Sequence, residues 1–231
     1  MKLDHIYKHL SFSDYLKLDA YLPINKEKVV IHPGKRECRF SMLDNAYLEF
    51  IHERTIKGFF YNRGFGWDGL ALKYEGDMHK LRDDLGAKGI EAEYSHRPYK
   101  WKEGAKGPGW HFIDFPQAPF KKLHFWIIKY DPTGVVKKKK ELTGYKLDKV
   151  SINSSEEGKK FLSKIIGNPK GDIFELENAK IELNTDLDKK AISSISILID
   201  SLEKITLPLD DGHKKLVDEN SWDISFMERP K

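Results

Sequence analysis

The sequence contains a single cysteine, Cys38, among its 231 residues. One cysteine cannot form an intramolecular disulfide or a cysteine-based zinc cluster, so we expect neither. Long hydrophobic runs are also missing: an apolar stretch such as residues 195–199 is far shorter than the roughly 20 residues that cross a bilayer. Because the chain opens without a basic start and an unbroken apolar stretch, we expect a cytoplasmic protein with no membrane-spanning segment.

The chain carries little net charge of either sign. It has 40 basic and 36 acidic residues, which gives +4 at pH 7, and the two signs are interspersed. This balance predicts no nucleic-acid partner. With 39% apolar and 12% aromatic residues, the composition is that of an ordinary folded protein and excludes the disordered and collagenous classes.

Secondary-structure signals recur in the same order along the chain. Alternating or β-branched runs predict strands over residues 3–10, 28–31, 38–43 and 46–51, with a helix capped by Ser13 or Asp14 after the first strand. The same order follows again, with strands over residues 67–74, 91–94, 110–115 and 123–128 and a helix capped by Asp77. Both units are therefore predicted to be β-α-β-β-β.

A third copy is visible and incomplete. It has a strand over residues 147–152, a helix that starts at Ser155, and a hairpin over residues 173–183, while residues 194–199 would open a fourth copy whose remainder is missing. The pattern predicts an α+β protein with paired modules over residues 1–131 (1–56 and 64–131), a third partial module over 145–205 and a polar C-terminal tail over 206–231.

Several motifs in the first two units carry a family resemblance. They are His5 after Leu3-Asp4, the His32-Pro33-Gly34 turn, Glu49 within the strand 47–51, Gly66-Trp67-Asp68-Gly69-Leu70-Ala71, and Ala87-Lys88-Gly89. In order and spacing they resemble the glyoxalase-like family of the vicinal oxygen chelate superfamily (the glyoxalase/bleomycin resistance/dioxygenase fold), over roughly residues 1–205. The resemblance implies tandem βαβββ modules that form a cup-shaped mixed β-sheet, with the third, incomplete module beside it.

In that superfamily the cup holds a divalent metal ion. By alternation, Leu3, His5 and Tyr7 share one face of the first strand, and Tyr47, Glu49 and Ile51 share one face of the fourth. The resemblance also implies that the first and fourth strands of a unit lie side by side, so His5 and Glu49 would supply half of a metal site, because opposed side chains on neighbouring strands lie close together. The pseudo-symmetric partners in the second unit would be Asp68 and His124. Imidazole and carboxylate ligands suit Zn²⁺, Ni²⁺, Mn²⁺ or Fe²⁺.

Each candidate ligand has a plainer structural interpretation. His5 could bond only to backbone or to Glu49, and Glu49 could form a salt bridge with Arg39 or Arg97. Asp68 could be a turn residue, and His124, where the family more commonly has a small or apolar residue, could pack against Phe125 and Trp126. The third unit has Lys149 and Glu182 in place of His5 and Glu49, so it cannot bind a metal in the same way.

Two functional hypotheses follow from these residues. The first is a metal-dependent lyase or isomerase, or a related dioxygenase-like enzyme, that acts on a small oxygenated metabolite with Glu49 as the catalytic proton shuttle. The second is a non-catalytic, sequestering protein that stacks a planar ligand on aromatic side chains. In either case the predicted ligand-contacting residues are Tyr7, Tyr47, Arg97, Trp110 and Trp126. The cup can close within one chain, so a monomer or a homodimer is expected.

Overall fold

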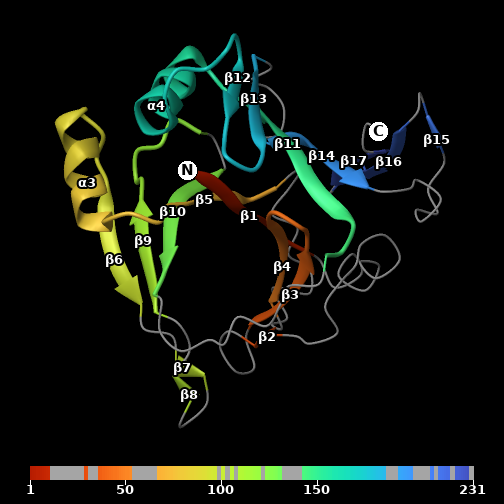
Figure 1. Ribbon diagram of the computed structural model, residues 1–231, viewed down its shortest axis with the longest axis horizontal. Helices are drawn as coiled ribbons and strands as arrows, with labels where there is room; N and C mark the ends of the chain where they lie inside the picture. The colour runs from red at the N-terminus through yellow and green to blue at the C-terminus, as the bar shows by residue number, and fades with distance from the viewer. Residues whose placement is uncertain are drawn as a thin grey trace.

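The computed structural model describes residues 1–10, 29–30, 36–53, 67–97, 100–101, 105–106, 109–120, 123–131, 142–185, 192–199, 209–210, 213–218 and 222–228. Its largest element is an eight-stranded mixed sheet with the strand order β2-β3-β4-β1-β5-β10-β9-β6. The strands are β1 (Lys2–His9), β2 (Val29–Val30), β3 (Arg36–Met42), β4 (Tyr47–Glu53), β5 (Gly69–Lys73), β6 (Glu93–Arg97), β9 (Trp110–Asp114) and β10 (His124–Tyr130). Figure 1 shows this sheet curving from β6 over β1 to β3.

A second sheet has seven strands in the order β12-β13-β11-β14-β17-β16-β15. Its strands are β11 (Tyr145–Asn153), β12 (Ile173–Glu175), β13 (Lys180–Asn184), β14 (Ile192–Ile199), β15 (Leu209–Asp210), β16 (His213–Asp218) and β17 (Trp222–Glu228). The short strands β7 (Lys100–Trp101) and β8 (Ala105–Lys106) pair only with each other.

Both sheets are built by one rule. In each module the first strand pairs in parallel with the last, as β1 does with β4, β5 with β10, β11 with β13 and β14 with β17. Two modules then join through antiparallel pairing of their first strands, β1 with β5 and β11 with β14. The strand pairing thus gives four modules, two in each sheet, where the sequence predicts two complete units, an incomplete third and only the start of a fourth.

Two helices lie among the described residues, and both begin where the sequence predicts. Helix α3 (Met78–Ala87) is capped by the Asp77 side chain, which accepts the backbone N–H groups of His79 and Lys80. Helix α4 (Glu156–Ile166) is capped by Ser155. The helix predicted after Ser13 or Asp14 lies outside the described residues. Neither α3 nor α4 is long and apolar enough to cross a membrane.

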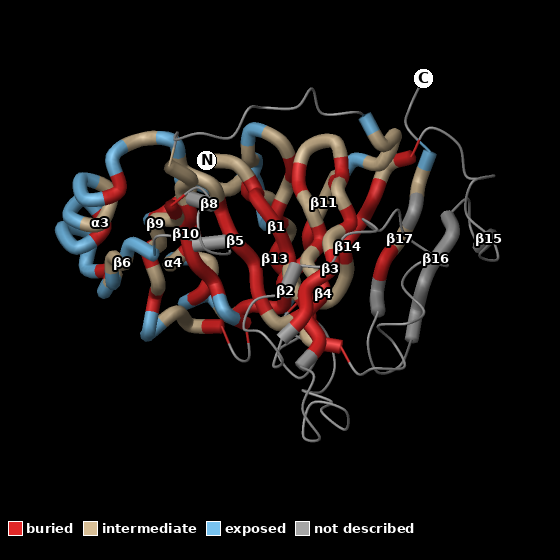
Figure 2. The backbone as a smooth tube through the Cα atoms, turned by 90° about the horizontal axis from the view of Figure 1, so that it is seen from below, coloured by how far each residue is buried: buried red, intermediate tan, exposed pale blue. Residues whose placement is uncertain are grey.

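The core lies on the helix-covered side of the first sheet and continues into the second. Leu3, Ile6 and Phe50 are almost fully buried there together with Met78 of α3 and Leu162 of α4. Figure 2 shows buried residues concentrated on the central strands and exposed residues on α3 and β6. Phe161 of α4 packs against the rings of Phe115, Phe120 and Phe125.

Two asparagines join the first and third modules in a pseudo-symmetric way. Asn45, in the β3–β4 turn, donates to the carbonyl of Leu147 and accepts its N–H. Asn178, in the β12–β13 turn, does the same with Leu3. Each amide also donates to the carbonyl of the other asparagine, at 2.6 and 2.7 Å. Equivalent hydrogen bonds therefore hold the first and third modules together.

Two sequence predictions require correction. Composition predicts a polar tail over residues 206–231, but β15, β16 and β17 lie there and complete a fourth module. The polar composition of this segment hides strands that pair at the edge of the second sheet. Alternation predicts that Leu3 shares a face with His5, but the β1–β5 register shifts between these residues, so Leu3 lies in the core instead.

Candidate functional site

The side of the first sheet opposite the helices carries a set of aromatic and ionisable side chains. We call it the His5 face, and it comprises His5, Tyr7, Tyr47, Glu49, Ala71, Trp110, Phe112, Trp126, Ile128 and Tyr130. These residues come from five neighbouring strands and alternate with core residues along each strand. The sheet therefore separates a hydrocarbon core from a face with chemical groups.

The centre of this face is a short chain of polar contacts through His5. Its Nδ1 lies 2.7 Å from Oδ2 of Asp4, and its Nε2 lies 3.8 Å from Oε2 of Glu49. Because a carboxylate only accepts, Nδ1 carries the proton, and the lone pair of neutral His5 points at Glu49. This is the carboxylate–histidine arrangement that orients imidazole bases and metal ligands.

Two buried phenols extend the chain beyond Asp4. The hydroxyl of Tyr130 donates to Oδ2 of Asp4 at 2.6 Å, and the hydroxyl of Tyr47 lies 3.2 Å from that of Tyr130. Burial and the nearby Asp4 carboxylate raise the pKa of Tyr130. Burial, reinforced by Tyr130 and Asp4, raises the pKa of Tyr47 well above its usual range. Both phenols therefore stay protonated and act as hydrogen-bond donors.

Aromatic packing fixes the position of the His5 ring. Tyr47 stacks on it with a centroid distance of 4.6 Å, and Trp126 meets it edge-on at 5.1 Å. The rings of Tyr7 and Trp126 cross directly over Gly69, where a Cβ atom would lie 2.1 Å from Cε1 of Tyr7. Glycine at this position gives the two rings the space they occupy.

The structure brings His5 and Glu49 together, whereas the side chains of the other two predicted ligands have other polar partners. Asp68 accepts the backbone N–H of His9 at 2.6 Å and lies 3.2 Å from its Nδ1. His124 lies at the border of the His5 face, half exposed and stacked on Trp126, with Nε2 3.0 Å from Asp114 and Nδ1 3.5 Å from the Tyr7 hydroxyl. Among the described residues, the ion-pair partner of Glu49 is His5 and not Arg39 or Arg97.

The predicted ligand-contacting residues lie on or beside the same face of the sheet. Tyr7, Tyr47, Trp110 and Trp126 all lie on the His5 face. Arg97 lies at its edge, with its guanidinium 5.4 Å from the centroid of the Phe112 ring. Nothing in the sequence points to Asp4 and Tyr130, because a bulged residue and the end of β10 produce no periodic signal.

The described residues do not complete a divalent metal centre at His5. Open catalytic sites use three protein ligands, whereas the only described group of three candidate ligands is elsewhere. That group consists of His96, His111 and Asp131, whose ligand atoms all lie within 4.8 Å of one another. It could hold a metal ion. No sequence motif predicts it, because the pairing of β6 with β9 brings the two histidines together.

Asp131 interacts with both histidines of this group. Its Oδ2 lies 3.2 Å from Nε2 of His96, and its Oδ1 is hydrogen-bonded to Nε2 of His111. The hydrogen bond with His111, helped by His96, holds the pKa of the Asp131 carboxyl below its usual value. This group is partly open to solvent.

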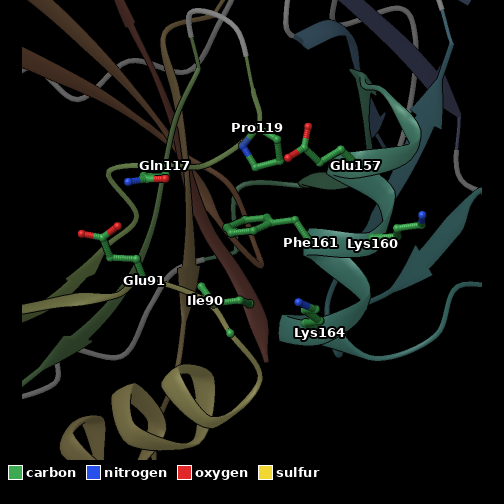
Figure 3. Close-up of a pocket in the computed structure, with 9 residues that line it drawn as sticks. Ile90, Glu91, Gln117, Pro119, Glu157, Lys160, Phe161 and Lys164 are labelled. Atoms are coloured by element: carbon green, nitrogen blue, oxygen red, sulfur yellow. The ribbon is translucent and has the colours of Figure 1, made fainter.

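Two cavities lie away from the His5 face. One of about 470 Å³ separates α4 from the loops that follow α3 and β9, and Figure 3 shows Phe161 pointing into it opposite Ile90 and Gln117. The other, of about 280 Å³, is lined by Asp77, Met78, His79, Tyr94, His111 and Lys129. It adjoins the His96–His111–Asp131 group.

No family model matches the sequence, and no curated protein does. Solved structures do match in three dimensions. One is a hypothetical protein from Staphylococcus aureus, 12% identical over 99% of both chains with a TM-score of 0.65. Another is a catechol 2,3-dioxygenase, 12% identical over 100% of this chain and 88% of its own, with a TM-score of 0.58.

A third similar structure is a mutant 4-hydroxymandelate synthase from Streptomyces coelicolor. It is 13% identical, covers 87% of this chain and 73% of its own, and has a TM-score of 0.57. At such identities the likeness concerns the fold alone. It confirms the predicted fold class, since the chain is an α+β protein with open mixed sheets arranged as in dioxygenases of the vicinal oxygen chelate fold.

Proposed function

We propose that this protein is an enzyme that transfers a proton within a small oxygenated molecule bound on the His5 face, as an isomerase or lyase does. One observation carries the proposal: Asp4 fixes the His5 ring so that Nε2 points at the Glu49 carboxyl group 3.8 Å away. An oriented imidazole beside a carboxyl group is the usual arrangement for general acid–base chemistry.

The reaction class follows from the two groups of the pair. With Nδ1–H donated to Asp4, Nε2 of His5 presents a lone pair as a base, and the Glu49 carboxyl group lies beside it as the group that can carry an acid proton. Nε2 of His5 can remove a proton from a hydroxyl-bearing carbon beside a carbonyl group while the Glu49 carboxyl group donates a proton to the carbonyl oxygen, which gives an enediol. The His5 imidazolium then returns its proton to the former carbonyl carbon while the Glu49 carboxylate takes the hydroxyl proton of the first carbon, so the isomer forms and both residues regain their starting states.

The surrounding side chains supply binding rather than proton transfer. Tyr7, Trp110 and Trp126 offer flat apolar surfaces to a small ligand. Arg97 at the edge of the face suits a carboxylate or phosphate on the substrate. No step of this proposal runs through a metal ion, because the described residues supply only His5 and Glu49 as neighbouring ligands.

Hydrogen exchange tests the proposal on a panel of simple compounds. The full chain is incubated in D₂O with small α-hydroxycarbonyl compounds, and NMR measures deuterium at the carbon beside the carbonyl. We expect exchange that His5→Gln and Glu49→Gln each slow by about 10²–10⁴-fold. The matched control is Glu182→Gln, which changes the equivalent carboxylate of the third module and should leave exchange unchanged.

Two outcomes would contradict the proposal. One is exchange that survives His5→Gln, which would remove the histidine from the chemistry. The other is exchange that EDTA abolishes and Zn²⁺, Ni²⁺, Mn²⁺ or Fe²⁺ restores, which would make the reaction metal-dependent, as the family resemblance implies. Binding without exchange on any compound would instead favour a sequestering protein.

A further inference from the structure

The far edge of the first sheet brings three ligand-type side chains together, well away from His5. His96 of β6 and His111 of β9 are directly opposite each other in the antiparallel register. Asp131 is the residue that follows β10. His111 alternates with Trp110 and Phe112 along β9, so its side chain lies on the opposite side of the sheet from the His5 face.

The spacing of the ligand atoms suits one ion. Two ligands bound at 2.0–2.1 Å to a tetrahedral ion lie about 3.3 Å apart. Nε2 of His96 lies 3.2 Å from Oδ2 of Asp131, and all three ligand atoms lie within 4.8 Å of one another. The two imidazole rings stack at 4.3 Å with an interplanar angle of 14°. Both rings thus present Nε2 to the same carboxylate.

A glycine supplies the space in which the three ligand atoms meet. A Cβ atom on Gly109 would lie 1.9 Å from Oδ2 of Asp131 and 2.8 Å from Nε2 of His96. The backbone N–H of Asp131 donates to the carbonyl of Gly109 at 2.8 Å, which holds the carboxylate over this position. Any larger residue would fill the place where the three ligand atoms converge.

A second contact orients His111, the less exposed histidine of the group. The hydroxyl of Tyr94 lies 2.7 Å from Nδ1 of His111. When Nδ1 carries the proton and donates to Tyr94, the lone pair of Nε2 is left for a metal ion. Metal-binding histidines usually have such a partner on the other ring nitrogen.

We propose that His96, His111 and Asp131 bind one divalent transition-metal ion of the zinc class. Two imidazoles and a carboxylate favour Zn²⁺, Co²⁺, Ni²⁺ or Cu²⁺ over Mg²⁺ and Ca²⁺, which prefer oxygen ligands. Three protein ligands leave at least one position open. That position is accessible to solvent, because 41% of the His96 side chain is exposed. The site is independent of the proton transfer proposed at His5.

Cobalt titration tests this site directly. Tag-free full chain is stripped with a chelator and titrated with Co²⁺ while visible absorption is recorded, and Zn²⁺ is then added as a competitor. We expect one ion per chain, with bands that Zn²⁺ removes. His111→Gln and Asp131→Asn should each weaken binding at least about 100-fold, and Tyr94→Phe about 10-fold. Gly109→Ala should also abolish binding, since its methyl group occupies the site.

The matched control is His124→Gln. His124 also pairs with a carboxylate, Asp114 at 3.0 Å, but belongs to no described group of three ligands. Its loss should leave Co²⁺ affinity unchanged, and circular dichroism without metal should show that every variant is folded. Zn²⁺ at 100 times Kd should raise Tm by about 5–10 °C.

Three outcomes would overturn the proposal. Absence of cobalt bands in the wild-type protein would mean that Asp131 only exchanges hydrogen bonds with the two rings. Binding that survives both His111→Gln and Asp131→Asn would place the ion elsewhere. Binding that is lost in His5→Gln but kept in His111→Gln would place it on the His5 face.

Discussion

The first and third modules have the same frame but different chemistry at equivalent positions. Leu3-Asp4-His5 of β1 corresponds to Leu147-Asp148-Lys149 of β11, and each strand shifts its register between the leucine and the third residue. Glu49 and Glu182 lie at equivalent places on the neighbouring parallel strands, opposite Tyr7 and Ser151. The modules thus differ mainly in the basic side chain beside the glutamate, which is His5 in the first module and Lys149 in the third.

The residue at this position, His5 or Lys149, decides whether the glutamate carboxylate forms a close ion pair. In the third module, Nζ of Lys149 lies 2.9 Å from Oε2 of Glu182, which also accepts the Ser151 hydroxyl. In the first module, Asp4 holds His5 so that Nε2 stays 3.8 Å from Glu49. The His5 side chain is 3% exposed and the Lys149 side chain 30%. A shared fold therefore positions the pair, and the residue type decides whether it can react.

The substitution with the largest expected effect is His5→Lys, which gives the first module the lysine–glutamate pair of the third module. We expect proton exchange to fall by about 10²–10⁴-fold, because a lysine ammonium would close on Glu49 and cannot accept a proton at neutral pH. The deuterium-exchange assay measures the loss, with Lys149→His as the control that should keep full activity. Full activity in His5→Lys would refute the role given to the imidazole.

A second prediction compares the two bulged aspartates through stability. Asp4→Ala removes the acceptor of both His5 Nδ1–H and the Tyr130 hydroxyl, so the free energy of unfolding should fall by about 3 kcal/mol. Asp148 makes no hydrogen bond or ion pair within the described ranges, so Asp148→Ala should cost no more than about 0.5 kcal/mol. Urea unfolding measures both, and equal losses would contradict the assignment of Asp4.

The positions of the strands and helices are well predicted from the sequence, because alternation, caps and turns are local signals. The strands around His5 and Glu49, and the caps at Asp77 and Ser155, are where the pattern places them. The pairing of His5 with Glu49 is predicted by alternation together with the adjacency of the first and fourth strands, which the family resemblance implies.

The features that the sequence does not predict depend on register and on contacts between distant residues. The bulge at Asp4 moves Leu3 into the core, and Asp4 reaches Tyr130 across 126 positions of the chain. Asp68 and His124 are neighbours at the starts of their strands, since the N–H of His124 donates to the Asp68 carbonyl, but their side chains have different partners. Alternation places residues on strands and cannot choose between such partners.

A third prediction tests whether the turn asparagines of the first and third modules contribute equally to stability even though the two sites differ. Asn45→Ala and Asn178→Ala each remove three hydrogen bonds between the modules, so each should cost about 2 kcal/mol of unfolding free energy. Because each amide donates to the backbone carbonyl of the other asparagine, which alanine keeps, the two variants lose no hydrogen bond in common and the double variant should lose about the sum. A large loss of unfolding free energy for one variant and none for the other would show that the two turns are not equivalent.

The smallest expected effect comes from the Lys149–Glu182 ion pair of the third module. The hydrogen bond from Lys149, followed by that from Ser151, lowers the pKa of Glu182 below its usual 4.5. A lowered folded-state pKa stabilises the protein above the unfolded value, and this contribution is lost as pH falls through the folded value. Glu182→Gln should therefore cost about 0.5 kcal/mol at pH 7, and the difference from wild type should vanish in acid. Urea unfolding at both pH values checks this, and a pH-independent difference would mean that the ion pair contributes nothing.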